Sequence, residues 1–270
     1  MREGAPSLTA AAVAVARALA PRQPDPYAPI FLPRPLGAAL AAIARSALGR
    51  RAARRLSLGL VDHIALRTAT IDRALTDALE AGARQVVLLG AGLDARAWRL
   101  APDALFFEVD HRATQERKRA RARVLGRPPR FVPVDFARER LADALARAGH
   151  DASVPTAWIW EGVTMYLPPR AVRETLQQVA ERSAPGSRLV ATYLADEALR
   201  LEPAVRAVFR ACLDEPLLSS YTPAAFRREL EAAGFRPLFD GNSRSWETAM
   251  GGDPQRARLL QAERMTIAAR

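Results

Sequence analysis

The chain has 270 residues, of which 49% are apolar and 26% are charged, as in an ordinary globular protein. This composition excludes a disordered chain, a collagen-like fibre and a coiled coil. No run of about 18 uncharged apolar residues occurs, so no membrane-spanning helix is expected. The single cysteine, Cys212, excludes an intrachain disulfide and a multi-cysteine metal site. The three histidines are widely separated in the sequence, and we expect no metal site.

The formal net charge of +11 is carried almost entirely by arginine, because Lys118 is the only lysine among the 40 basic residues. Such an excess of positive charge attracts anions. Arginine-rich runs at residues 50–55 and 117–123 have the charge to contact phosphate. Aromatic residues are only 6% of the chain and are not interleaved with these runs, as base-stacking platforms would be. We interpret both runs as solvated helix faces and keep a nucleic-acid-binding or RNA-modifying protein as an alternative.

The N-terminal segment Leu8–Ala20 is apolar, follows Arg2 and ends in Ala-Leu-Ala, which resembles a secretory signal. Arg17 interrupts it and alanine dominates it, so we predict an amphipathic helix instead. Together with the single cysteine, this predicts a cytoplasmic protein. Six prolines between residues 21 and 35 argue against a regular helix there, and a helical pattern resumes over Ala38–Leu48. Residues 1–60 are therefore expected to form a helical cap.

A further helix is predicted over Leu60–Ala81, and Gly82 ends it. After this helix, short apolar runs alternate with helical segments. Seven apolar runs are expected to be strands: Gln85–Leu89, Ala104–Val109, Phe131–Val134, Thr156–Trp160, Arg188–Leu194, Phe235–Phe239 and Met265–Ala269. The helices expected between them begin at about Ala95 and Thr114 or cover Arg138–Ala148, Pro169–Ala184, Glu197–Leu213 and Pro223–Ala233. This alternation predicts an α/β fold with a Rossmann-like, doubly wound, mostly parallel seven-stranded sheet that has helices on both faces. The domain would cover residues 61–270, with a helical insertion at 196–225.

The residues at the ends of the predicted strands indicate a binding site. The first strand runs into Gly90-Ala91-Gly92-Leu93-Asp94-Ala95, which fits G-x-G-x-x-[G/A] in a strand–turn–helix context. The second strand ends at Asp110, about twenty residues after the first glycine, the spacing of a carboxylate that accepts from ribose hydroxyls. The third ends at Asp135 and the fourth at Glu161. Because parallel strands end at one sheet edge, the series predicts a site for a nucleoside-containing cofactor.

Two cofactors compete for such a site. A dinucleotide such as NAD lays its pyrophosphate on the helix after the glycine turn, where the charge of Asp94 would oppose it. S-adenosylmethionine has no phosphate and one carboxylate, for which Arg67 or Arg96 could supply a guanidinium. The sequence has no Tyr-x-x-x-Lys pair and no Gly-Lys-Ser/Thr segment. These features favour S-adenosylmethionine, and an NAD-dependent oxidoreductase on a Rossmann fold remains the alternative.

The same segments resemble a known family. Val87–Leu100 is similar to the signature of the leucine carboxyl methyltransferase-like family of class I S-adenosylmethionine-dependent methyltransferases. Further segments with this resemblance are Asp25–Ala28, Arg67–Asp72, Glu108–Asp110, Val132–Phe136 and Trp160–Leu167. The first of these looks like the bacterial O-methyltransferase branch. The resemblance spans roughly residues 25 to 195 and implies the same cofactor and fold.

The resemblance also implies roles for individual residues. Arg67 would bind the methionyl carboxylate, and Gly90, Ala91 and Gly92 would approach the methionine part. Asp110 would hold the ribose hydroxyls, and Asp135 and Phe136 would frame the adenine. Glu161 would lie near the methionyl ammonium at the mouth that faces the substrate, and Glu161 and Tyr166 are the catalytic candidates. The family's lysine in the N-terminal cofactor segment has no counterpart here.

We therefore expect an S-adenosylmethionine-dependent O-methyltransferase that acts on a carboxylate or acidic hydroxyl of a small molecule. A carboxylate is already ionised at neutral pH and needs no general base, whereas a hydroxyl needs one. No histidine–carboxylate pair is evident, which favours a carboxylate acceptor. The basic surface would fit an anionic substrate, and neither a membrane nor a nucleic-acid partner is expected.

Overall fold

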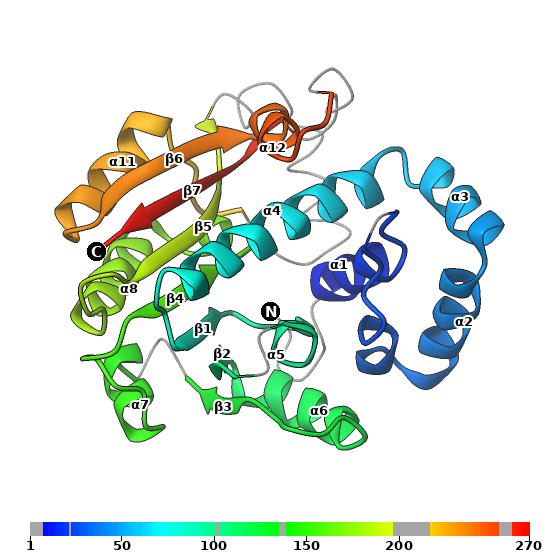
Figure 1. The fold of residues 1–270 in the computed structure, drawn as a ribbon, viewed down its shortest axis with the longest axis horizontal. Helices are drawn as coiled ribbons and strands as arrows, with labels where there is room; N and C mark the ends of the chain where they lie inside the picture. Colours follow the sequence, from blue (N-terminus) through cyan, green and yellow to red (C-terminus); the bar gives the residue numbers. More distant parts are fainter. Residues whose placement is uncertain (1–7, 22, 101–102, 135–138, 197–216, 254–260) are drawn as a thin grey trace.

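The computed structural model describes residues 8–21, 23–100, 103–134, 139–196, 217–253 and 261–270. Its centre is one seven-stranded sheet in the order β3-β2-β1-β4-β5-β7-β6 (Figure 1). The strands are β1 (Gln85–Leu89), β2 (Leu105–Asp110), β3 (Arg130–Pro133), β4 (Thr156–Trp160), β5 (Arg188–Leu194), β6 (Arg236–Asn242) and β7 (Glu263–Ala269). The Rossmann-like fold class predicted from the sequence is confirmed, and three of the strands have the predicted bounds.

The order of the strands creates a crevice at one edge of the sheet. Strands β1 to β5 are parallel, and β7 lies antiparallel between β5 and β6. The chain moves outward from β1 through β2 to β3 and then returns to place β4 on the other side of β1. In open α/β sheets, ligands bind beyond the carboxyl ends of the strands at such a reversal. The fold therefore indicates a ligand site at the carboxyl ends of β1 and β4.

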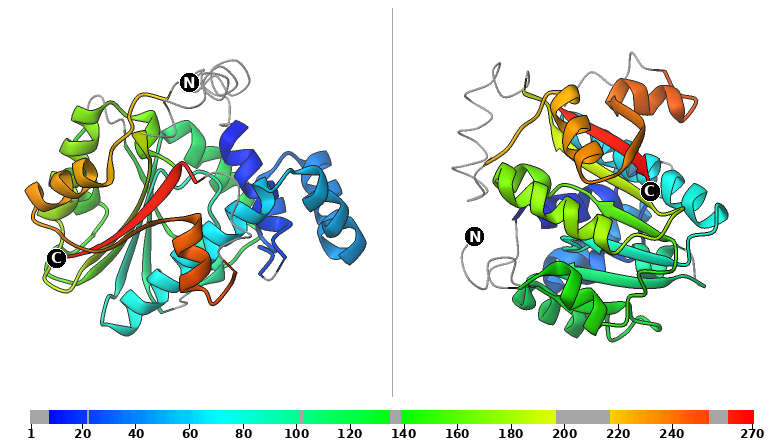
Figure 2. Two further views of the ribbon diagram at one scale, coloured as in Figure 1. Left: turned by 90° about the horizontal axis from the view of Figure 1, so that it is seen from above. Right: turned by 90° about the vertical axis from the view of Figure 1, so that its left-hand side faces the viewer.

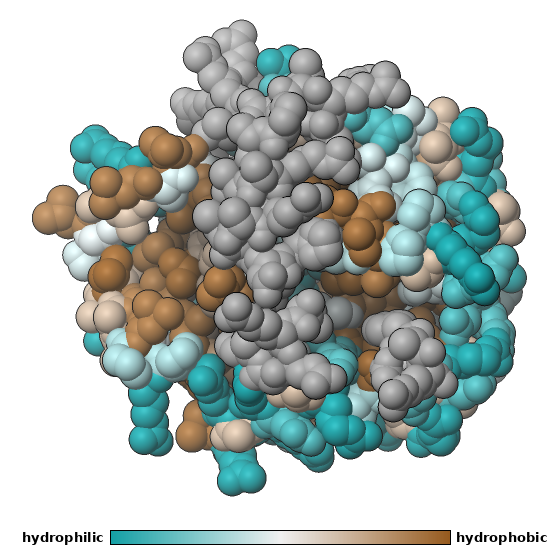
Figure 3. Space-filling view, turned by 180° about the vertical axis from the view of Figure 1, so that it is seen from behind, coloured by the Kyte–Doolittle hydropathy of each residue, from teal (hydrophilic) through white to brown (hydrophobic). Residues whose placement is uncertain are grey.

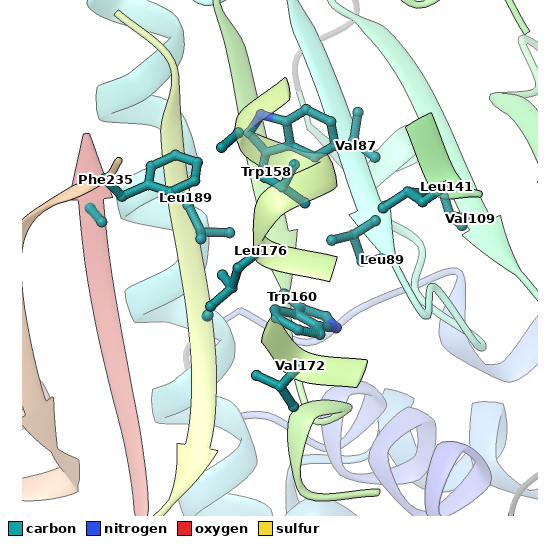
Figure 4. Close-up of a cluster of buried hydrophobic side chains, with 14 of the residues drawn as sticks. Val87, Leu89, Val109, Leu141, Trp158, Trp160, Val172, Leu176, Leu189 and Phe235 are labelled. Carbon is teal, nitrogen blue, oxygen red and sulfur yellow. The ribbon is translucent and has the colours of Figure 1, made fainter. Parts of the chain in front are cut away.

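Helices cover both faces of the sheet. On one face, α7 (Leu141–Arg147), α8 (Pro169–Glu181) and α11 (Pro223–Ala232) pack on inward side chains of the strands. Trp158 and Trp160 of β4 lie here beside Leu176 of α8 (Figure 4). Both tryptophans are buried core residues, because alternate residues of β4 face this layer.

The other face is covered by α4 (Leu60–Glu80) and α12 (Ser243–Ala249). Ile71 and Leu75 of α4 are fully buried against it, together with Trp246 of α12. Their four-residue spacing places the two α4 side chains on one helix face. Gly82 follows α4 with φ +108°, a conformation that glycine adopts without a steric penalty, and ends the helix as predicted.

The N-terminal helices form a separate layer at the side of the sheet. They are α1 (Leu8–Ala18), η1 (Ala28–Phe31), α2 (Arg34–Arg45) and α3 (Ala47–Leu56). Figure 1 and the left view of Figure 2 show α2 and α3 projecting from the body of the molecule. A small apolar core joins this layer to the start of α4 through Val61 and Ile64. The division into a cap of residues 1–60 and a domain of residues 61–270 stays a prediction.

Two predicted helix bounds in this layer are wrong. The helix expected over Ala38–Leu48 begins earlier, since Pro35 is tolerated in a first turn, where its missing N–H has no partner to lose. It also ends earlier, because Ser46 is extended and its Oγ accepts from Gly49 N at 3.1 Å. Ser46 thereby caps a new helix, α3.

Other differences from the sequence prediction are local. The helix expected from Ala95 is the four-residue α5 (Arg96–Arg99), and α6 (Arg112–Ala122) begins two residues earlier than expected, where His111 accepts from a backbone amide. Helix α12 and the short η2 (Thr164–Tyr166) were not expected. The expected helix Glu197–Leu213 and Cys212 lie outside the described residues. Among the described helices, none combines the length and apolar character needed to cross a membrane.

Candidate active site

The glycine turn after β1 lies at the point where the strand order reverses. Gly90 has φ +67° and Gly92 has φ +48°, both in the left-handed region. Gly90 is also tightly enclosed, since a Cβ there would lie 2.4 Å from Cγ2 of Val163. The turn is held to β2, because the amides of Gly90 and Ala91 both donate to the carbonyl of Val109. Glycine at position 90 is thus required by its backbone angle and by its neighbour.

Asp110 lies at the end of β2, beside this turn. Its Oδ2 accepts from Gly92 N at 2.6 Å, and its Oδ1 accepts from His111 N at 2.6 Å. Burial raises the pKa of this carboxyl above its ordinary value, while the two backbone hydrogen bonds oppose that rise. Each carboxylate oxygen has a second lone pair. The structure therefore places a fixed acceptor group next to the glycine turn.

A group of buried charges surrounds the end of β4, and we call it the arginine–carboxylate cluster. Its members are Arg17, Arg67, Asp72, Asp94, Arg96, Arg99, Glu161 and Glu263. The four guanidinium groups face these four carboxylates, and Asp25 lies 3.7 Å from Arg99. Opposite charges paired in this way let the cluster stay ionised away from water.

Glu161 lies at the centre of the arginine–carboxylate cluster. Its Oε2 accepts from Arg17 at 2.9 Å and from Arg96 at 2.7 Å, and its Oε1 accepts from Arg67 at 2.9 Å. The side chain is 6% exposed. Burial favours the neutral acid, but the three guanidinium groups outweigh it and hold the pKa of Glu161 well below its ordinary value. Glu161 is thus an ionised anchor that arginines enclose.

Arg67 reaches this anchor from α4, as predicted for a residue that only the fold can bring there. Its Nη1 also donates to both oxygens of Glu263, at 2.8 and 3.0 Å. Arg67 and Asp72 lie on the same helix five residues apart but do not form a surface pair. Arg67 is buried, and Asp72 instead pairs with Arg96 and Arg99.

Asp94 occupies the entrance to α5. Its Oδ1 accepts from Arg96 N at 2.8 Å, and its Oδ2 pairs with Arg17 at 3.1 Å and with the Arg96 side chain. Burial opposes ionisation, but Arg17 and Arg96 outweigh it and lower the pKa of Asp94. An anionic side chain thus already uses the backbone donor at this short helix. A pyrophosphate would meet a negative charge there.

The structure brings most of the predicted site residues to one edge. Arg67, Gly90, Ala91, Gly92, Asp110 and Glu161 lie there. Tyr166 follows Glu161 in η2 and is half-buried. Glu161, expected at an open mouth, is enclosed by arginines instead. Asp135 and Phe136 lie outside the described residues, although β3 points toward this edge.

Four cluster members, Arg17, Asp72, Arg99 and Glu263, were not named as site residues from the sequence. Asp72 and Arg99 lie within segments that carry the family resemblance. Arg17 is a lone charge in an alanine-rich helix, and that isolation was the available signal, because a charge on an apolar face needs a buried partner. Glu263 begins β7, close to the C-terminus, and no local pattern relates it to Arg67. The antiparallel insertion of β7 beside β5 is what brings it near.

A second buried pair lies next to the site. Lys118 Nζ is 2.7 Å from Oε2 of Glu108, and both side chains are almost fully buried. The ammonium also lies over the rings of Phe31 and Trp98, at 5.4 and 5.6 Å from their centroids. Burial raises the pKa of Glu108 to about 7, against the effect of Lys118. This contact connects η1 to the sheet through α6.

The sheet order and the glycine turn with its acidic strand ends define the Rossmann-like fold typical of methyltransferases. A solved structure from Thermobifida fusca, titled as a methyltransferase, matches it with a TM-score of 0.65 at 21% identity. That match covers 100% of this chain and 96% of the other. At this identity the likeness shows the fold.

The chain belongs to the leucine carboxyl methyltransferase family, whose model matches residues 10–180. A Streptomyces coelicolor protein, provisionally named an S-adenosyl-L-methionine-dependent methyltransferase, is 46% identical over 143 residues, which cover 51% of this chain and 50% of that protein. A Mycobacterium marinum protein with the same provisional name is 41% identical over 208 residues, 69% of this chain and 63% of its own. The chain thus spans about half to two thirds of these relatives.

Proposed function

We propose that this protein is an S-adenosylmethionine-dependent methyltransferase that methylates a carboxylate or acidic hydroxyl oxygen of a small molecule. The observation that carries the proposal is the position of Arg67 and Asp110 on opposite sides of the Gly90 turn. One offers a buried guanidinium and the other a carboxylate. These are the groups that the two ends of this cofactor need, a carboxylate at one end and ribose hydroxyls at the other. Family membership supports the same activity.

The residues present fit this cofactor. Arg96 Nη2 is a buried donor without a hydrogen-bond partner among the described residues. Arg67, Arg96 and the turn would hold the methionine part, and Asp110 would hold the ribose. Asp135 and Phe136 stay the predicted adenine contacts.

An NAD-dependent oxidoreductase fits the same residues less well. The helix after the glycine turn is only four residues long, and Asp94 accepts from its backbone amide. Both features weaken the anion site that a pyrophosphate uses. S-adenosylmethionine places no phosphate there.

When bound, S-adenosylmethionine supplies a methyl group on a positively charged sulfur. The acceptor oxygen must approach along the line of the carbon–sulfur bond, so the protein contributes mainly by holding the reactants and excluding water. Glu161 is a poor general base because three guanidinium groups keep it ionised. We therefore assign Glu161 to positioning Arg67 and Arg96, and we keep Tyr166 as a candidate side chain at the acceptor. The sequence showed no histidine–carboxylate pair, but the structure contains one, since His63 Nε2 lies 2.8 Å from Oε2 of Glu263. A missing base therefore no longer favours a carboxylate over an acidic hydroxyl, and both acceptors stay in the proposal.

Calorimetry with S-adenosylhomocysteine and with NAD tests the cofactor. The expected result is binding of the first and much weaker binding of the second, and tighter binding of NAD would overturn the proposal. Incubation of small-molecule acids with methyl-labelled S-adenosylmethionine then tests the acceptor. A labelled product that mild base hydrolyses is a carboxyl methyl ester, whereas a base-stable product is an ether. The predicted cytoplasmic location belongs to the same proposal.

A further inference from the structure

Exposed apolar side chains gather on the projecting N-terminal helices. More than half of the large exposed apolar residues in the described parts of the chain lie within residues 34–60: Leu36, Ile43, Leu48, Leu56, Leu58 and Leu60. Leu48, Leu56 and Leu58 are 77%, 83% and 81% exposed. Seen from behind, brown side chains lie beside teal ones along the left margin, the side to which α2 and α3 turn (Figure 3). We call α2, α3 and the following turn to Leu60 the basic–apolar flank.

The same flank is strongly cationic. It contains Arg34, Arg45, Arg50, Arg51, Arg54 and Arg55, and the sequence has no acidic residue between Asp25 and Asp62. Asp62 pairs with Arg54 at 2.7 Å, and this is the flank's ion pair to a carboxylate in the described structure. The remaining guanidinium groups leave a local positive charge of about five, which attracts an anionic surface.

Helix α3 separates these two properties onto neighbouring sides. A helical turn of 100° per residue places its four arginines within one arc of about 140° and places Leu48, Ala52 and Leu56 in the neighbouring arc. None of its ten residues is buried in this chain. Gly49 lets Ile43 of α2 approach closely, because a Cβ there would be 3.3 Å from Cγ2 of Ile43. The two helices thus present a fixed amphipathic surface that no described part of the chain covers.

We propose that the basic–apolar flank docks on the surface of an anionic lipid bilayer. A helix with arginines on one face and leucines on the other lies in the membrane interface, with its apolar face among the acyl chains and its cations at the headgroups. Contact of this kind requires no membrane-spanning helix. This membrane contact was not expected from the sequence, because the residue pattern did not show that a helix break at Ser46 makes α3 a separate helix.

Charge and composition favour this occupant over two others. A symmetric contact with a second copy would bring two sets of six arginines together, and like charges repel. A nucleic acid would satisfy the arginines, but the flank has no aromatic residue for base stacking, and its leucines would gain nothing. Only a lipid surface accepts the cations and the leucines together.

Co-sedimentation of the purified protein with vesicles tests the proposal. Vesicles of phosphatidylcholine with about one third phosphatidylglycerol should bind the protein at low salt, and pure phosphatidylcholine should not. Leu48→Glu/Leu56→Glu should lower the partition at least about tenfold. Val124→Glu/Leu238→Glu is the matched control with the same change in net charge, because Val124 and Leu238 are 77% and 42% exposed and lie outside the flank. Arg51→Gln/Arg55→Gln should lower the partition about tenfold or more, whereas Arg119→Gln/Arg123→Gln, with the same change in net charge, should not.

Three results would overturn the proposal. One is failure of the wild-type protein to bind the anionic vesicles. Another is an equal loss of binding in the flank variants and in their controls, which would show that vesicle binding depends on net charge alone. The third is a wild-type dimer that Leu48→Glu/Leu56→Glu converts to a monomer, which would assign the flank to a contact between copies. Circular dichroism of each variant establishes that it is folded, and the arginine variants give a second readout that leaves the apolar side unchanged.

Discussion

The guanidinium of Arg67 donates through Nε to Oε1 of Glu161 at 2.9 Å, although 94 residues separate the two in the sequence. The contact joins the middle of α4 to the carboxyl end of β4, and neither side chain reaches bulk water. Because a buried charge without a partner is costly, the two residues hold each other in place. A ligand carboxylate at this edge would meet a guanidinium whose position is already fixed.

The first prediction concerns the geometry of this guanidinium. Arg67→Lys keeps the charge but loses the planar group whose Nε and Nη1 donate to Glu161 and Glu263, and with it the fixed direction of the remaining N–H donors toward a ligand carboxylate. We expect the affinity for S-adenosylhomocysteine to fall at least about tenfold in calorimetry. Arg73→Lys is the control, because Arg73 lies on the same helix and its side chain is 72% exposed. Equal affinities of the two folded variants would remove Arg67 from the cofactor site.

The second prediction separates two roles of Asp110. In Asp110→Ala, the lost hydroxyl contacts, each worth about 1.5–3 kcal/mol, should weaken cofactor binding by at least tenfold. The same variant leaves Gly92 N–H without its acceptor. Asp110→Asn keeps an oxygen for one of the two backbone amides, Gly92 N–H, and loses the acceptor for His111 N–H, so its melting temperature should fall less than that of Asp110→Ala while affinity falls in both. The exposed Asp143 provides the control variant Asp143→Asn. Wild-type affinity in Asp110→Asn would contradict the ribose assignment.

The third prediction concerns the glycine turn. Gly90→Ala should destabilise the protein by roughly 1–2 kcal/mol from its positive φ and by a further 1–3 kcal/mol from the clash with Val163. Gly126→Ala, where a Cβ meets nothing within 4 Å, should leave the thermal unfolding midpoint unchanged. Val163→Ala in the Gly90→Ala background should restore part of the stability, since it removes the clash and leaves the backbone strain. If the Gly90→Ala variant is as stable as Gly126→Ala, the predicted strain and the clash with Val163 are refuted.

The fourth prediction is a pH dependence. Burial raises the pKa of Glu108 to about 7, so the folded state binds more protons than the unfolded state at mildly acidic pH. The contribution of Glu108 to stability is therefore present below the unfolded pKa and is lost as the pH rises toward about 7, by roughly 3 kcal/mol at most.

Denaturant unfolding at several pH values tests this contribution. Glu108→Gln should flatten the change in the free energy of unfolding across that window, even if it lowers stability at every pH. Glu174→Gln, which alters an exposed partner of Arg170, should keep the wild-type slope. A wild-type slope in Glu108→Gln would show that the carboxyl titrates elsewhere.

The sequence by itself determined the elements of the sheet and the residues at their ends. The strand Gln85–Leu89 and the glycines after it were identified because a buried parallel strand is a continuous apolar run and because glycine marks a strained turn. The acidic residues at the ends of β2 and β4 followed from counting along the chain. Helix bounds were less accurate around Ser46, where one side chain's hydrogen bond decides between one helix and two. All of these are local signals, because each depends on residues that are neighbours in the sequence.

Only the tertiary structure decided which charges meet. Arg17, Arg67 and Arg96 come from three segments and converge on Glu161 through the packing of α1 on α4 and of α4 on the sheet. Glu263 joins them from the other end of the chain, because β7 inserts antiparallel beside β5. The reason is that an ion pair depends on distance and burial, and neither has a period along the sequence. A sequence can show that a charge needs a partner, but the fold selects which one.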